Sequence, residues 1–577
     1  MENRITAYIQ SDNIISALGL TTAENMTAIR AYRSGISLQK RSDIASTPIQ
    51  AAIIDRDRIA EQASLFGLKD YSLLEQLFIL SIADMLCAIN RQSPARRTAL
   101  ILSTTKGNVD RLAGCTDIPE EAFLSNTAHK IADYWGIASE DAYIISNACI
   151  SGVSALIMAQ RMINAGTYEE VIVAGGDILS PFITSGFLSF KSVSSKPCRP
   201  YDAARDGLNL GEACGSLLLS NKYREGAVAI TGGAVTNDAN HISGPSRTGD
   251  GLFYAISNAM QEAGITPSDV DFVNAHGTAT AYNDEMESKA ILWAELQNIP
   301  TNSLKPYFGH TLGASGIIET IVCARAIQEE FIPATLHYET CGVPCPLTIE
   351  AKHRTHTHTD ACVKTASGFG GCNAAIVLQK NRLATRPSLP PVETQTIARC
   401  TLDNSKLELN GNVLYKAENN DDFATFIRNA YKAVDGKNMK FYKMSDLCKT
   451  GYVATEALLQ KCDTFAPNQI AILLANKSAS LDTDRKHQDI LDTEGEPAAS
   501  PAVFVYTLPN VASGEICIRH KIQGENTFFI QDRYESKKLE EYARTVMAHD
   551  KLKYCIVGWC EFLQGKCSAD LKLITTI

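Results

Sequence analysis

The chain has 577 residues, more than one hydrophobic core normally serves, so its length predicts two or three domains. Apolar residues make up 45% of the chain and charged residues 20%, which is typical of a globular protein and excludes a disordered one. The formal net charge of −10, without any tract rich in Lys and Arg, argues against general binding to nucleic acid.

The N-terminus and the cysteines indicate the compartment. MENRITAYIQSDNIISALG lacks the basic segment followed by an apolar segment that marks a signal peptide. No run of about 18 apolar residues that would span a bilayer occurs. The 17 cysteines are scattered through apolar segments without the paired spacing of metal ligands. We therefore expect reduced thiols and a cytoplasmic protein.

Strand-like and helix-like segments alternate through the first 380 residues. TALILST precedes AHKIADYWG, and FVNAHGT precedes DEMESKAILWAEL. Alternation of this kind predicts an α/β fold with layered sheets.

The stretch YIISNACISGVSALIMAQRMI, residues 143–163, places Cys149 between a short β-branched segment and a long apolar one. The first is typical of a buried strand and the second of a deeply buried helix. Cys149 is then expected at the N-terminus of that helix, where the helix dipole favours the nucleophilic thiolate. Taken alone, the segment fits a purely structural cysteine equally well.

Three later segments carry further candidate site residues. NAHGTATAYNDEMES puts His276 directly after a strand, at the sheet edge where α/β folds bind ligands. NSLKPYFGHTLGASG puts Lys305 and His310 before a glycine-rich turn and another apolar helix. TASGFGGCNAAIVLQ interrupts a strand with GFGG at 368–371, where backbone N–H groups can approach a ligand and stabilise an oxyanion.

Each of these residues also has a purely structural interpretation. A histidine at a strand end is more often a satisfied structural residue, and Lys305 alone would be a solvated surface charge. The glycines alone would fit a bulge or a hairpin corner. HRTHTHTD, residues 353–360, has three histidines, but no cysteine or carboxylate cluster accompanies them. We interpret this segment as an exposed strand edge rather than a metal site.

The segment 379–400 is rich in Pro, Thr and Arg with little periodicity, which indicates a linker. We therefore expect one domain over residues 1–380, a linker over 381–404 and a second domain over 405–577.

The second domain repeats part of the first. Three of its segments match three of the first domain in pattern and order, which predicts a shortened copy of the first domain's N-terminal half. The position equivalent to Cys149 falls near Tyr534, so the copy lacks the nucleophile, and it also lacks the later histidine motifs. The matched pairs are 466–484 with 95–110, 506–530 with 122–145, and 551–563 with 167–179.

Taken in order, the motifs of the first domain resemble the β-ketoacyl-acyl carrier protein synthases of the thiolase superfamily, in their elongating type II form. The resemblance covers essentially residues 3–380 and includes SALGLTTAENMTAIRAYRSGIS near the start and CRPYDAARDGLNLGEACGSLLL at 198–219. HGTAT and GHTLGASG are highly specific in this order and spacing. The resemblance implies a thiolase-like fold of α-β-α-β-α layers over 1–380, followed by a smaller α/β half-domain.

Three small departures from the family pattern are visible. Asn147 precedes Ala-Cys where Thr or Ser is common, GEACG replaces Gly-Glu-Gly-Ala-Gly, and Cys372 stands where Thr is frequent. None of them removes a catalytic group, so they bear on substrate or chain-length preference more than on activity.

The resemblance implies a decarboxylative Claisen condensation of an acyl thioester with malonyl-acyl carrier protein, giving 3-oxoacyl-acyl carrier protein. Cys149 would hold the acyl group as a thioester. The backbone N–H groups of Cys149 and Phe369 would form the oxyanion hole, and Phe369 also matches the family's gating aromatic residue. His276 and His310 would donate hydrogen bonds to the enolate that forms as carbon dioxide leaves.

Further roles follow from the same resemblance. Lys305 is expected to hold the network around His310 and to pair with Glu287. Thr278 and Thr280 match the positions that contact the phosphopantetheine arm. No metal and no redox cofactor is implied, because the phosphopantetheine belongs to the carrier protein. Family members work as dimers, so we expect a homodimer or a ketosynthase-like partner.

Three other interpretations compete with this one. A cysteine hydrolase needs one histidine oriented by Asn or Asp, and a thiolase normally has a second catalytic cysteine in a late glycine-rich segment. A non-enzymatic chain-length partner describes 405–577 well but 1–380 poorly. The second domain fits a pseudo-subunit and a degenerate packing remnant equally well. Fatty acid and polyene or polyketide products are both compatible with the motifs.

Overall fold

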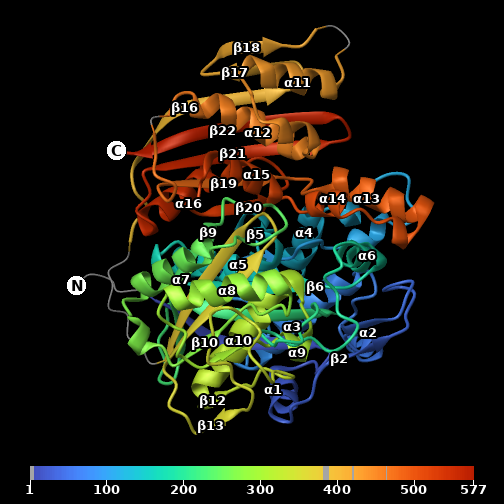
Figure 1. The fold of residues 1–577 in the computed structure, drawn as a ribbon, viewed down its shortest axis with the longest axis vertical. Helices are drawn as coiled ribbons and strands as arrows, with labels where there is room; N and C mark the ends of the chain where they lie inside the picture. Colours follow the sequence, from blue (N-terminus) through green and yellow to red (C-terminus); the bar gives the residue numbers. More distant parts are fainter. Residues whose placement is uncertain (1–5, 381–388, 419–420, 463) are drawn as a thin grey trace.

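The structure is a computed structural model that describes residues 6–380, 389–418, 421–462 and 464–577. Figure 1 shows two units stacked along the long axis, with the second unit, in orange and red, above the first. Within these ranges, no helix combines the length and the apolar character needed to cross a membrane.

Two sheets form the frame of the first unit. One has the strand order β5-β4-β6-β8-β1 and the other β9-β15-β14-β10-β11, and β1 pairs with both β8 and β9. The strands are β1 (Ala7–Ser16), β4 (Thr98–Ser103), β5 (Ala142–Ile145), β6 (Glu170–Asp177), β8 (Ala213–Ser220), β9 (Val228–Asn237), β10 (Phe272–Asn274), β11 (Thr301–Asn302), β14 (Ala361–Gly368) and β15 (Cys372–Lys380).

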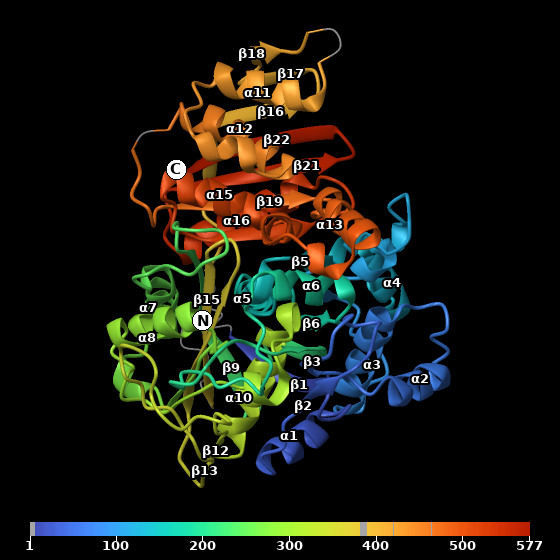
Figure 2. The ribbon, with the colours of Figure 1, turned by 45° about the vertical axis from the view of Figure 1, so that its right-hand side comes forward.

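Helices separate and cover the two sheets, which confirms the predicted thiolase-like layers. α5 and α10 lie between the sheets, α3 covers the outer face of the first sheet, and α7 covers the outer face of the second, with α8 beside it (Figure 2). Every residue of α5 from Ser151 to Ile163 is buried, as its apolar sequence predicts. These helices are α3 (Leu73–Cys87), α5 (Ser151–Asn164), α7 (Asp250–Ala263), α8 (Ala281–Trp293) and α10 (Ser315–Gln328), and α1 (Thr22–Arg30), α2 (Arg56–Leu65), α4 (Leu124–Trp135), α6 (Pro181–Ser189) and α9 (Lys305–Phe308) lie around them.

The second unit is one sheet with the order β18-β17-β16-β22-β21-β19-β20. Its order β20-β19-β21-β22-β16 matches β5-β4-β6-β8-β1 of the first unit, which confirms that it resembles the first unit's N-terminal half. The strands are β16 (Thr394–Asp403), β17 (Lys406–Leu409), β18 (Asn412–Lys416), β19 (Ile470–Asn476), β20 (Asn526–Ile530), β21 (Tyr554–Leu563) and β22 (Lys566–Thr576). The helices are α11 (Phe423–Ala433), α12 (Asp446–Leu459), α13 (Leu481–Glu494), α14 (Pro501–Phe504), α15 (Val511–His520) and α16 (Ser536–His549).

One boundary prediction is wrong. β16 lies inside the segment predicted as a linker, 381–404, and pairs along its length with β22 of the second unit. Its inward positions are Ala398, Cys400 and Leu402. Only the leucine is large and strongly apolar, so the alternation was too weak to predict a strand. Residues 381–388 of the predicted linker lie outside the described residues.

The two units share one continuous sheet. β20 pairs antiparallel with β5, Phe529 opposite Ile145 and Ile530 opposite Ile144. Beyond this short ladder, the Asn147 side chain donates from Nδ2 to the Asn526 carbonyl at 2.8 Å and accepts from the Phe528 N–H at 3.1 Å. β5 pairs with β4 on its other side, so a second copy of the chain cannot pair with this strand.

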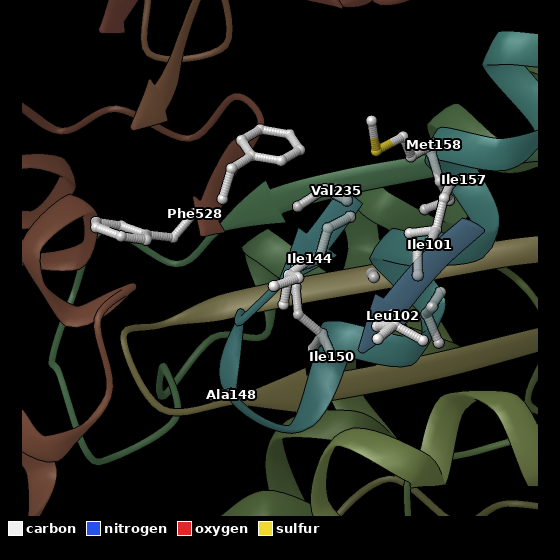
Figure 3. Close-up of a cluster of buried hydrophobic side chains, with 14 of the residues drawn as sticks. Ile101, Leu102, Ile144, Ala148, Ile150, Ile157, Met158, Val235 and Phe528 are labelled. Atoms are coloured by element: carbon white, nitrogen blue, oxygen red, sulfur yellow. The ribbon is translucent and has the colours of Figure 1, made fainter. Parts of the chain in front are cut away.

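Apolar side chains continue the core across the same seam. Figure 3 shows Phe528 of the second unit beside the cluster that contains Ile144, Ala148 and Val235 of the first. Ile157 on α5 belongs to this cluster as well. The core that supports the Cys149 turn is therefore built from both units.

A buried ion-pair network reinforces the contact. Arg161 on α5 has no exposed surface. Its guanidinium donates to Glu525 at 2.5 Å and to Asp550 at 2.9 Å, both in the second unit. Buried carboxylates of this kind depend on their cation, because water does not replace it.

We expect Arg161→Met to lower the free energy of unfolding by about 3–5 kcal/mol, because Glu525 would stay buried and the half-buried Asp550 would also lose its cation. Urea unfolding followed by circular dichroism measures the loss. Arg58→Met is the matched control: it removes the exposed ion pair with Glu24 and should cost less than about 1 kcal/mol. Equal losses in the two variants would contradict this account of the contact.

Candidate active site

Cys149 lies on a tight turn between β5 and α5, as predicted. Ala148 has a φ of 48°, a left-handed conformation that costs a non-glycine residue about 1–2 kcal/mol. Ser151 braces the turn: its hydroxyl accepts from the Asn147 N–H at 2.8 Å and donates to the Ala148 carbonyl at 2.6 Å. The turn holds Cys149 nearly buried, with 9% of its surface exposed.

Close packing of α5 against α10 brings a histidine to this sulfur. A Cβ built on Gly152 would lie 2.9 Å from the Ile317 nitrogen, so only glycine permits the approach. His310, which precedes α10, then lies with Nε2 3.1 Å from Cys149 Sγ. The His276 ring stands nearly perpendicular to the His310 ring, with 5.1 Å between centroids.

The protonation of His310 follows from its contacts. The Leu312 N–H donates to Nδ1 at 3.3 Å, so in the neutral ring Nε2 carries the hydrogen. Burial lowers the pKa of His310 well below its usual value, and Lys305 and Lys364 lower it further. The pKa of His276 is also well below its usual value, through burial first and then Lys305. Both rings are therefore neutral, and His310 points an N–H at the sulfur.

The resting state of Cys149 differs from the prediction. Burial raises the pKa of its thiol to about 12, and the lowering effect of Lys305 does not compensate. The expectation that the helix dipole favours a thiolate here is therefore wrong for the resting enzyme, because desolvation of the anion outweighs the dipole. Cys149 is a thiol at neutral pH.

The predicted partner of Lys305 is also wrong. Lys305 Nζ bonds Glu319 Oε1 at 2.5 Å, and Lys364 Nζ bonds Glu319 Oε2 at 2.5 Å, so one buried carboxylate on α10 joins two lysines. Although burial acts to raise it, the pKa of Glu319 is below its usual value because of these two lysines. The triad leaves one net positive charge beside the two imidazoles.

Glu287 instead supports the loop that carries His276. Its carboxylate accepts from the backbone N–H of His276 at 2.8 Å and of Gly277 at 2.7 Å. The Tyr201 hydroxyl donates to it at 3.0 Å. Glu287 thus orients His276 directly, without contact to Lys305.

A cavity of about 250 Å³ opens onto these groups. Thr278 and Thr280 line it, with 2.8 Å between their hydroxyl oxygens. Phe369 lines it too and packs on Phe190, with 5.2 Å between ring centroids. A larger cavity, about 660 Å³, lies around Glu262 between the units and contains none of the predicted site residues.

The end of β14 approaches the Cys149 backbone. A Cβ built on Gly368 would lie 3.1 Å from the Cys149 nitrogen, so a glycine leaves this N–H open to a ligand. The oxyanion hole formed with the Phe369 N–H stays a prediction.

Three functional residues were missed from sequence. Glu319 and Lys364 complete the triad with Lys305. Asp177, at the end of β6, accepts from the Gly313 N–H at 2.7 Å and from the Thr105 N–H at 3.0 Å. Asp177 thereby fixes the turn that follows His310. The available signal was a charged residue within or at the end of an apolar element, as in GIIETIVC, ACVKTAS and EVIVAGGD.

HRTHTHTD contains a short strand, β13 (Arg354–Thr355), which pairs with β12 (Phe331–Ile332). No group of three His, Cys, Asp or Glu side chains in the described ranges is placed to hold a metal ion.

Known proteins resemble this chain in sequence and in fold. The family profiles "Beta-ketoacyl synthase, N-terminal domain" and "Beta-ketoacyl synthase, C-terminal domain" match residues 111–225 and 227–339. The chain is 31% identical over 287 residues to "Putative polyketide beta-ketoacyl synthase 1" of Streptomyces cyaneus, covering 47% of this chain and 68% of the relative. It is 27% identical over 417 residues to "3-oxoacyl-[acyl-carrier-protein] synthase 2" of Coxiella burnetii, covering 66% of this chain and 99% of the relative.

Among solved structures, "PfaC Keto synthase-Chain length factor" aligns with a TM-score of 0.76 and 13% identity, covering 99% of this chain and 78% of the other. At this identity the likeness concerns the fold alone, but it includes both units. The sequence matches go further, since one relative is 31% identical over 68% of its own length: the chain belongs to the beta-ketoacyl synthase family.

Proposed function

We propose that Cys149, His276 and His310 perform the decarboxylative condensation by which beta-ketoacyl synthases extend an acyl chain. The observation that carries this proposal is the 3.1 Å contact between His310 Nε2 and Cys149 Sγ, with a second neutral imidazole beside it. A cysteine hydrolase would need Nε2 as an acceptor for the thiol proton. Here Nδ1 accepts a backbone N–H, so Nε2 is a donor.

The first half-reaction is a thiol exchange. Cys149 Sγ attacks the acyl thioester of a carrier protein and loses its proton, and the departing pantetheine thiol gains one, so no net proton is needed. His310 Nε2–H stabilises the sulfur as charge develops on it. The backbone N–H groups of Cys149 and Phe369 would bind the oxyanion of the tetrahedral intermediate.

The second half-reaction forms the carbon–carbon bond. The malonyl carboxylate leaves as carbon dioxide, and the two imidazoles donate to the thioester oxygen on which the enolate charge appears. The enolate carbon attacks the acyl carbonyl, Cys149 departs as a thiolate, and one proton from solvent restores the thiol. Neutral rings suit this role, because a donor is needed and no proton has to be transferred.

The arm of the carrier protein would reach Cys149 along Thr278 and Thr280, which line the same cavity. No group in this sequence of steps is oxidised or reduced, and the two imidazoles supply the donors for the enolate oxygen, so we propose that the enzyme needs no metal and no redox cofactor. We propose a reducing, cytoplasmic setting, because the 17 cysteines are scattered through apolar segments without paired spacing.

We propose that the second unit acts as a pseudo-subunit rather than as a degenerate remnant. It takes the place at β5 where a partner strand would pair, and it also packs against residues that line the pocket. Phe504 packs on Phe187, and Phe187 stacks on Phe369, with 5.6 and 6.2 Å between the ring centroids. The chain thus carries a ketosynthase-like partner within itself. A homodimer formed through another surface stays a prediction.

Cys149→Ala should form no acyl-enzyme, because the nucleophile is gone. His310→Ala should still accept an acyl group but lose about 10²–10³ in condensation rate with malonyl carrier protein, because one enolate donor is missing. Intact-protein mass spectrometry follows acylation, and carbon dioxide release follows condensation. An acyl group on the Cys149→Ala protein at the wild-type level would contradict the assignment.

Alkylation of Cys149 by iodoacetamide should accelerate continuously from about pH 7 to about pH 10, because burial raises the thiol pKa from 9.0 to about 12 and the reactive thiolate gains population throughout. Peptide mass spectrometry of the Cys149 peptide measures the rate, with free N-acetylcysteine as the reference. A rate that levels off below about pH 8 would indicate a thiolate already formed at rest and contradict the burial argument.

A further inference from the structure

The loop between β14 and β15 lies between the reactive cysteine and the second unit. It comprises Phe369, Gly370 and Gly371, and the two glycines have φ values of 90° and 72°. On the side of the first unit, the Gly370 N–H donates to the Ile242 carbonyl at 2.6 Å and the Gly371 carbonyl accepts from Asp238 at 2.7 Å. The Phe369 carbonyl accepts from the Cys372 thiol at 3.2 Å, which leaves it one more acceptor direction toward the second unit.

The second unit supplies the stronger donor to that carbonyl, because an amide N–H donates better than a thiol. Asn510, at the N-terminus of α15, donates from Nδ2 to the Phe369 carbonyl at 2.8 Å and approaches Cys372 Sγ at 3.6 Å. The backbones are in close contact as well, because a Cβ built on Gly514 would lie 2.6 Å from the Gly370 carbonyl oxygen. A carbonyl partner requires a donor, which fixes the orientation of the Asn510 amide.

In a purely packing role, Asn510 would destabilise the folded chain. Only 1% of its surface is exposed, and its Oδ1 has no hydrogen-bond partner in the part of the chain that the structure describes. An unpaired buried acceptor costs about 1–3 kcal/mol, which an apolar side chain of similar size would avoid. The bond to Phe369 is therefore the contribution that distinguishes this amide.

The internal repeat offers a comparison. LPNVASG at 508–514 aligns with LSNTAHK at 124–130, so Asn126 is the equivalent position in the first unit. Asn126 donates to the Glu120 carbonyl at 3.3 Å on the exposed surface. The same residue type thus makes a surface contact in the first unit, whereas in the second unit it bonds the loop 369–371 beside Cys149.

We propose that Asn510 is a positioning residue for the condensation: from the second unit, it fixes the loop that places the Phe369 N–H and ring against Cys149. This inference rests on the proposed function of Cys149 and Phe369. A displacement of about 1 Å at a reacting group can cost about a hundredfold in rate, so one hydrogen bond to this loop is enough to matter.

Asn510→Asp tests the proposal with little change in size. Its carboxylate cannot donate to the Phe369 carbonyl, but its protonated form can, and burial raises the pKa of such a carboxyl group. We expect acyl transfer to Cys149 to fall about 10–100-fold at about pH 8, and the deficit relative to wild type to shrink as the pH falls. Asn510→Ala should show a similar deficit that does not change with pH. Asn126→Asp, the matched control, should behave as wild type.

The probes are acyl N-acetylcysteamine thioesters from acetyl to decanoyl. Intact-protein mass spectrometry follows the acylation of Cys149. Circular dichroism gives the folded fraction of each variant. Failure of the wild-type protein to be acylated by any probe would overturn the proposed function itself. With an acylated wild type, the inference about Asn510 alone is overturned if Asn510→Ala reacts at the wild-type rate. It is equally overturned if its deficit equals its unfolded fraction, or if a folded Asn510→Asp protein shows the same deficit at every pH.

Discussion

The short antiparallel ladder between β5 and β20 is the contact on which the rest of the structure depends. Ile145 ends both β5 and the ladder, and the turn that carries Cys149 begins at the next residue. Asn147 continues the pairing with its side chain, bonding the backbone of β20 from both ends of its amide. The nucleophile is therefore placed by a strand pairing to which each unit contributes one strand.

The same ladder determines what else packs against the walls of the pocket. With β20 fixed, α15 and α14 of the second unit face the catalytic loop and the aromatic cluster around Phe369. The sheet also fixes the start of α5, whose glycine contact with α10 brings His310 to the sulfur. A unit without a nucleophile thereby supports the walls of the active site.

Inside the pocket, burial sets the chemistry. Removal from water keeps the Cys149 thiol protonated and both imidazoles neutral, and the Lys305–Glu319–Lys364 triad adds a positive charge nearby. Cys149 and the two histidines carry no negative charge at rest, and the site stabilises the anions that the substrates generate. This fits a reaction whose first step needs no net proton and whose second step releases carbon dioxide.

Local motifs made the nucleophile and both histidines predictable, because each follows a strand or precedes a helix with an unmistakable glycine pattern. Contacts between distant elements were not predictable. Lys305 was assigned to Glu287 although Glu319 holds it, since the spacing of residues on two helices does not show which carboxylate faces the lysine. In the sequence, Asn147 is only a departure from the family pattern. The structure explains this residue by its bond to β20, a contact that forms only when the second unit is docked.

The seam between the units is tested most directly by cutting the chain between Lys380 and Leu389 at an inserted protease site. If the ladder and its surroundings hold the active site together, the two fragments will co-elute in gel filtration and acylate Cys149 at the rate of the uncut protein. Fragments that separate while the first one keeps its full acylation rate would contradict the account, because the second unit would then contribute nothing to the site.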